Sequence, residues 1–110
     1  MNIFRWFQST DEKRVAADMA RGLVQELPPA LMDERRHVLS VNRVTRVLER
    51  TLMTATQHQR DRRLGVLGRA RLANHFKWCL KAEGYAEDFV DMATEALVMQ
   101  LAKAARAPKT

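Results

Sequence analysis

The chain has 110 residues, of which 46% are hydrophobic and 29% are charged, and its formal net charge is +6. This length suits one domain, and the composition is that of a globular protein, which excludes a largely disordered chain. No stretch approaches the roughly 18 consecutive apolar residues that span a membrane, so we expect no integral membrane segment.

Cys79 is the one cysteine, so the chain cannot form an internal disulfide bond and suits a reducing compartment. The N-terminus lacks the long apolar stretch and the small-residue cleavage site of a signal peptide. We therefore expect a cytoplasmic protein.

The first seven residues, MNIFRWF, bring together the bulky side chains of Phe4, Trp6 and Phe7. We expect a short N-terminal helical segment that either folds back on the core or docks on a partner or a membrane. Peripheral membrane contact is not expected, because two helical turns with one arginine bind lipid only weakly.

The next segment predicts an amphipathic helix that begins at Ser9 and ends before Pro28 and Pro29. Ser9 and Glu12 have the spacing of a capping box, in which the two side chains satisfy free N–H groups of the first turn. The apolar residues follow at intervals of four, which places them on one face: Val15, Met19, Leu23 and Leu27.

A longer helix is predicted from about Leu31 to Leu64, because apolar residues recur every three or four positions without a helix breaker. Its apolar face comprises Val38, Val41, Val44, Leu48, Leu52 and Ala55. Gly65 and Gly68 then predict a tight connection, after which a new helix starts near Gly68.

The third helix carries an apolar stripe of Leu72, Phe76 and Leu80, and we expect Cys79 and Trp78 to help fill its apolar side. It ends at Gly84, since glycine adopts the left-handed conformation that closes many helices.

The last helix is predicted from about Glu87 to Ala105 and is followed by a frayed tail over residues 108–110. Val98 and Met99 make this helix apolar on more than one side. That pattern fits either a homodimer or central packing within a monomer.

No segment has the alternating pattern of a strand. The sequence therefore predicts an all-α bundle of about four main helices plus the short N-terminal segment, in a single domain over residues 1–107.

The positive charge is concentrated in the middle of the chain. Residues 43–77 hold nine basic side chains, eight of them arginine, against only Glu49 and Asp61. Arginine suits bidentate contacts with carboxylate or phosphate, so the segment Gln59–Arg71 and its surroundings form the candidate site. The candidate binding residues are Arg60, Arg62, Arg63, Arg69, Arg71 and Lys77.

Three interpretations of this site stay open. It binds an acidic protein partner, it binds nucleic acid as a regulator would, or it is a solvated connector whose charges keep the protein soluble. His75 and Cys79 share a helical face, but a structural metal site needs four ligands, so we expect no metal and no cofactor. No nucleophile and base stand in a catalytic pattern, and we expect an interaction or regulatory protein, not an enzyme.

Overall fold

The computed structural model describes residues 10–30, 32 and 41–106. Within these ranges the chain forms four helices and no strand: α2 (Thr10–Glu26), α4 (Val41–Arg62), α5 (Val66–Ala82) and α6 (Glu87–Arg106). The all-α prediction is confirmed for this part of the chain. The expected N-terminal helical segment with Phe4, Trp6 and Phe7, and the tail 108–110, lie outside the described residues.

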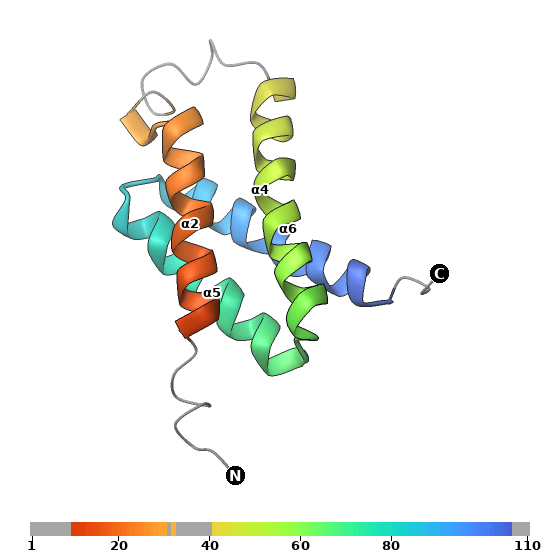
Figure 1. The fold of residues 1–110 in the computed structure, drawn as a ribbon. Helices are drawn as coiled ribbons and strands as arrows, with labels where there is room; N and C mark the ends of the chain where they lie inside the picture. Colours follow the sequence, from red (N-terminus) through yellow and green to blue (C-terminus); the bar gives the residue numbers. More distant parts are fainter. Residues whose placement is uncertain (1–9, 31, 33–40, 107–110) are drawn as a thin grey trace.

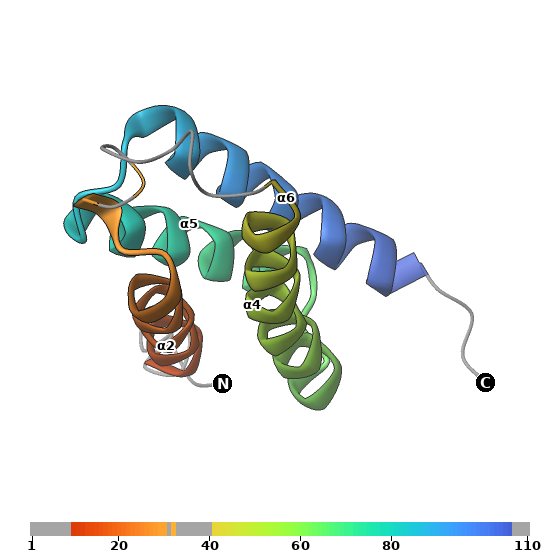
Figure 2. The same ribbon diagram turned by 90° about the horizontal axis from the view of Figure 1, so that it is seen from above.

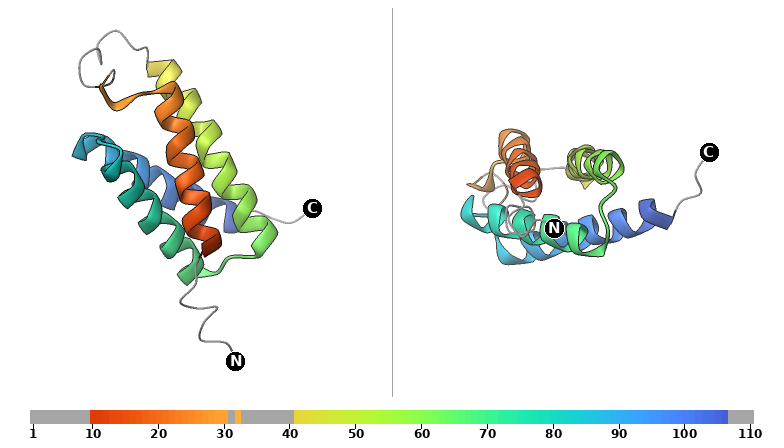
Figure 3. Two further views of the ribbon diagram at one scale, coloured as in Figure 1. Left: turned by 60° about the vertical axis from the view of Figure 1, so that its left-hand side comes forward. Right: turned by 60° about the horizontal axis from the view of Figure 1, so that its bottom comes forward.

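The four helices form two layers (Figures 1 and 2). The helices α2 and α4 run antiparallel in one layer, and α5 and α6 run antiparallel in the other. Each helix of one layer packs on a helix of the other, α2 on α5 and α4 on α6. At one end of the bundle the beginning of α2, the end of α4 and the first turn of α5 lie close together (Figure 3).

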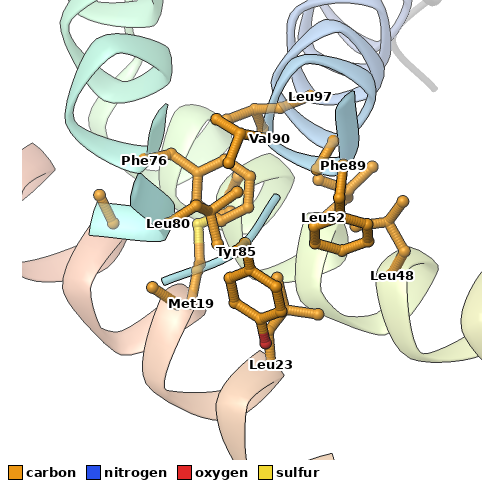
Figure 4. Packing of buried hydrophobic residues seen from close by; sticks show 14 of the residues in the cluster. Met19, Leu23, Leu48, Leu52, Phe76, Leu80, Tyr85, Phe89, Val90 and Leu97 are labelled. Atoms are coloured by element: carbon orange, nitrogen blue, oxygen red, sulfur yellow. The ribbon is translucent and has the colours of Figure 1, made fainter. Parts of the chain in front are cut away.

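One hydrophobic core lies between the layers and receives side chains from all four helices (Figure 4). Leu23, Phe76 and Leu97 are fully shielded from solvent. Burying a leucine or phenylalanine side chain contributes about 1.5–3 kcal/mol, so this core supplies most of the driving force for folding. A buried hydrogen bond from Gln59 Nε2 to the carbonyl of Leu101 (3.2 Å) also ties α4 to α6.

The end of α5 follows the expected glycine stop. Gly84 has a φ of +95°, and its N–H donates to the carbonyl of Lys81, while the N–H of Tyr85 donates to Leu80. These two bonds form a Schellman motif, which also carries Tyr85 into the core. The hydroxyl of Tyr85 donates to the carbonyl of Leu27 at 2.6 Å and so satisfies an acceptor beyond the end of α2.

The connection between α4 and α5 differs from the prediction. The turn lies at Arg63–Gly65, and α5 begins at Val66, before the predicted start at Gly68. Arg63 adopts the left-handed conformation, with a φ of 54°, and the N–H of Leu64 donates to the carbonyl of Gln59. Arginine therefore occupies a position that glycine usually fills. Gly68 lies inside the helix, where an added Cβ would come within 3.0 Å of Leu64 Cδ2.

Two predicted core positions are wrong. Val41 is 79% exposed because it begins α4, one turn before that helix meets its neighbours, and Val47 is buried instead. Trp78 is 58% exposed, and its ring packs under Lys81 Nζ at 5.0 Å from the centroid. Cys79 is half-buried against the core, as its position in the stripe suggested.

Candidate functional site

The predicted arginine-rich site forms a corner, which we call the α4–α5 corner and define as residues 59–71. Helix polarity explains why charge accumulates there. The positive N-terminal end of α2 carries Asp11 and Glu12, and the negative C-terminal end of α4 carries Arg60 and Arg62. Because α2 and α4 are antiparallel, these oppositely charged ends meet (Figure 1).

The Arg62 side chain is directed towards α2 and not outwards to a binding partner of the protein. Its guanidinium forms an ion pair with the Asp11 carboxylate, which also lies 3.6 Å from Arg14. Arg62 therefore neutralises an acid of its own chain and joins the end of α4 to the first turn of α2.

Glu12 lies at the centre of a second and more buried cluster. Its side chain is only 10% exposed, and Oε2 lies 3.0 Å from His58 Nε2 while Oε1 lies 3.9 Å from Arg71 Nε. A carboxylate removed from water requires such partners, since an unpaired buried charge is strongly destabilising. Arg71 thus holds Glu12 within the fold. Ser9, the expected capping partner of Glu12, lies outside the described residues.

The remaining predicted site residues divide into exposed and half-buried groups. Arg60 and Arg63 are exposed, and neither has an acidic partner among the residues that the structure describes. Arg69 is half-buried and donates to the carbonyl of Leu64 at 3.4 Å, and Lys77 is half-buried further along α5. The structure therefore brings five of the predicted residues to one corner but leaves only two fully available.

Two apolar side chains lie next to these available cations. Val66 is 72% exposed and Leu67 is 63% exposed, both in the first turn of α5. Gly65 provides the N-cap of this helix without a side-chain hydrogen bond. The corner is therefore a mixed surface of cations, apolar side chains and a helix N-terminus without a side-chain cap.

A further basic surface was not predicted as a site. Arg43, Arg46 and Arg50 are exposed on the outward side of α4, around a shallow hollow of about 300 Å³ that Glu26 and Val47 also line. Arg50 forms an ion pair with Glu26 at 2.8 Å. Their spacing of three and four residues places them on a common helical face.

The ionisable groups offer little sign of reactive chemistry in the described residues. Burial, together with the charge of Glu83, raises the pKa of the Cys79 thiol and so disfavours the nucleophilic thiolate. No group of three or more His, Cys, Asp or Glu side chains is placed to hold a metal within the described ranges. No described helix is both long and apolar enough to cross a membrane.

Comparisons with protein-family models, with curated proteins and with solved structures find no match to this chain.

Proposed function

We propose that this protein is a small, non-catalytic helical interaction protein that binds an acidic surface of a partner protein through the α4–α5 corner. The observation that carries the proposal is the combination of exposed Arg60 and Arg63 with exposed Val66 and Leu67. Arginine is enriched at protein–protein interfaces, and the buried centre of an interface is more apolar than the rest of the protein surface. Neighbouring exposed apolar side chains beside exposed arginines therefore support a protein-binding surface. The single Cys79 supports a reducing, cytoplasmic location for this interaction.

Arg62 and Arg71 have a different role in this proposal. Because they pair with Asp11 and Glu12, they connect the corner to α2, and we expect these contacts to restrict its movement. A rigid surface loses less conformational entropy when it binds, which favours affinity. The internal ion pairs thus support the corner, and the exposed arginines contact the partner.

Nucleic acid is the second candidate ligand of the same corner. It is favoured by the N-terminus of α5, where Gly65 leaves the first-turn N–H groups without a side-chain acceptor beside two exposed arginines. Helix N-termini of this kind attract phosphate. Phosphate contacts, however, give no role to the exposed Val66 and Leu67, and this is why we favour the protein partner.

Fluorescence anisotropy distinguishes the two candidates. The probes are a labelled acidic peptide containing leucine and tryptophan, and a labelled DNA duplex, each titrated at salt concentrations from about 50 to about 200 mM. We expect the peptide to bind, and Arg60→Gln with Arg63→Gln to weaken its binding about tenfold, which corresponds to about 1.4 kcal/mol. Leu67→Ser should also weaken peptide binding, because it removes an apolar contact.

The matched control also removes two positive charges, by Arg21→Gln with Lys81→Gln. Both residues are exposed. Arg21 lies in the second half of α2 and Lys81 in the last turn of α5, whereas the corner lies at the beginning of α5 and contacts the first turn of α2. The control should bind the peptide within about twofold of the wild-type protein, since it keeps every corner residue. Equal losses in the two variants would show that only net charge matters. Duplex binding that depends on Arg60 and Arg63 but not on Leu67 would establish the nucleic-acid alternative.

A further inference from the structure

Two exposed rows of side chains on different helices have the same spacing and opposite charge. On each helix the row occupies positions i, i+3, i+7 and i+10, which lie on one face. The α4 row is Arg43, Arg46, Arg50 and Met53, and the α6 row is Asp88, Asp91, Glu95 and Val98. All eight residues are exposed, with Met53 at 63% and Val98 at 49%.

The two rows differ clearly in their electrostatics. The α6 row carries three carboxylates, and the first basic residue of that helix is Lys103. Asp91 and Glu95 have no ion pair with any residue that the structure describes, and the same holds for Arg46 on α4. The charged side chains of each row have one sign, and each row ends in an exposed apolar side chain. Arg50 already pairs with Glu26 at 2.8 Å, and the Asp88 carboxylate accepts from the N–H of Phe89 at 2.8 Å, so these two groups would exchange or share partners in the contact.

The rows cannot meet within one molecule. The helices α4 and α6 pack through their inner sides, where Leu52 and Leu97 are buried and Gln59 donates to Leu101. The rows lie on the exposed sides of these helices, so only another molecule can bring an α6 row against an α4 row. A second copy of this chain is the partner that offers both surfaces.

We infer that the protein self-associates by placing the α4 row of one molecule against the α6 row of another. With the two helices parallel and in register, each arginine faces a carboxylate and the apolar ends face each other. The resulting pairs are Arg43 with Asp88, Arg46 with Asp91, Arg50 with Glu95, and Met53 with Val98. At a rise of about 1.5 Å per residue, the ten steps from the first to the last residue of each row extend over about 15 Å, so the two rows match in length.

A shallow hollow beside the α4 row leaves room for a side chain of the second molecule. It has a volume of about 440 Å³, lies between α4 and α6, and is lined by Arg46, Glu49, Arg50, Leu52, Met53 and Gln100. Its apolar lining from Leu52 and Met53 can receive an apolar side chain from the second copy. Met99, which is 66% exposed next to Val98, is placed to supply one. The contact joins two different surfaces of the molecule. It produces a closed dimer only if a two-fold axis forms the same contact twice, and otherwise it continues from molecule to molecule as an open chain.

Sedimentation velocity measurements on charge-reversal variants test this self-association. One variant carries Arg46→Glu and Arg50→Glu, and the other carries Asp91→Arg and Glu95→Arg. The wild-type protein should associate as its concentration rises, and added salt should weaken that association by screening. Each variant alone should associate at least about tenfold more weakly than the wild-type protein. An equal mixture of the two variants should recover association, because every row then finds a complementary one.

Recovery in the mixture cannot come from a folding defect, since a misfolded variant cannot be rescued by another variant, and circular dichroism of each variant alone must match the wild-type spectrum before a failure to recover is counted. Association unchanged in both variants, or failure of the mixture to recover it, would overturn the inference. A wild-type protein that stays monomeric at all concentrations would also overturn it. If such a monomer binds duplex DNA and Arg46→Glu with Arg50→Glu abolishes that binding, the α4 row contacts nucleic acid instead. The corner residues belong to neither row, so this test is separate from that of the proposed function.

Discussion

Arg71→Gln should destabilise the fold although arginines at protein surfaces usually contribute little to stability. The substitution leaves the Glu12 carboxylate, which is 10% exposed, with His58 as its remaining close partner among the residues that the structure describes. At 3.9 Å and an effective dielectric constant of about 20, the gross attraction between Arg71 and Glu12 is about 4 kcal/mol. Desolvation and the 32% exposure of Arg71 reduce the net effect, and we expect a loss of about 1–2 kcal/mol.

Urea denaturation followed by circular dichroism measures this loss, and Arg60→Gln is the matched control. Arg60 is exposed in the last turn of α4 and has no acidic partner among the described residues, so its substitution should change stability by less than about 0.5 kcal/mol. In thermal denaturation the Arg71 variant should melt about 5–10 °C below the wild-type protein.

A double-mutant cycle with Glu12→Gln isolates the interaction itself. If Arg71 acts through Glu12, the two single losses should not add, and the coupling energy should reach about 1 kcal/mol. A coupling energy near zero, or equal losses for Arg71→Gln and Arg60→Gln, would refute the division into structural and exposed arginines.

Three further substitutions test the helix ends and the core. Tyr85→Phe removes the donor to the Leu27 carbonyl and should cost about 1–2 kcal/mol in urea denaturation. Burial and the charge of Glu83 raise the pKa of Tyr85, the single tyrosine, from 10 to about 12, so the stability it contributes is complete below pH 10 and is lost as the pH rises to 12. An ultraviolet titration showing an ordinary pKa near 10 would contradict this. Gly22→Ala should stabilise α2 by about 0.5–1 kcal/mol in thermal melts, because nothing lies within 4 Å of the added Cβ. Arg63→Gly should gain about 1 kcal/mol by relieving the φ of 54°, and no gain in the melting temperature would contradict a strained cap.

Most of the fold follows from local patterns in the sequence. The stripe of Leu72, Phe76 and Leu80 predicted a buried helical face, and all three are fully buried. Gly84 predicted the end of α5 because a positive φ favours glycine. Such features depend on residues a few positions apart, and the sequence displays that information directly.

The roles of the arginines could not be predicted in the same way. Arg62 contacts Asp11 across about 50 residues, and Arg71 contacts Glu12 across still more, so these pairs depend on how α2 packs against the corner. In sequence, Asp11 and Glu12 indicate only a favourable helix start. The exposure of Val41 and Trp78 likewise depends on where the neighbouring helices end, which periodicity does not reveal.

The proposed function requires the α4–α5 corner to bind an acidic partner through Arg60, Arg63, Val66 and Leu67. Amide chemical-shift mapping of the ¹⁵N-labelled protein, titrated with the acidic leucine- and tryptophan-containing peptide, locates the binding surface residue by residue. We predict that the largest shift changes fall within residues 59–69, including the Gly65 and Gly68 amides, while α6 changes little. Changes centred on the outward face of α4, or no saturable changes at all, would contradict the claim.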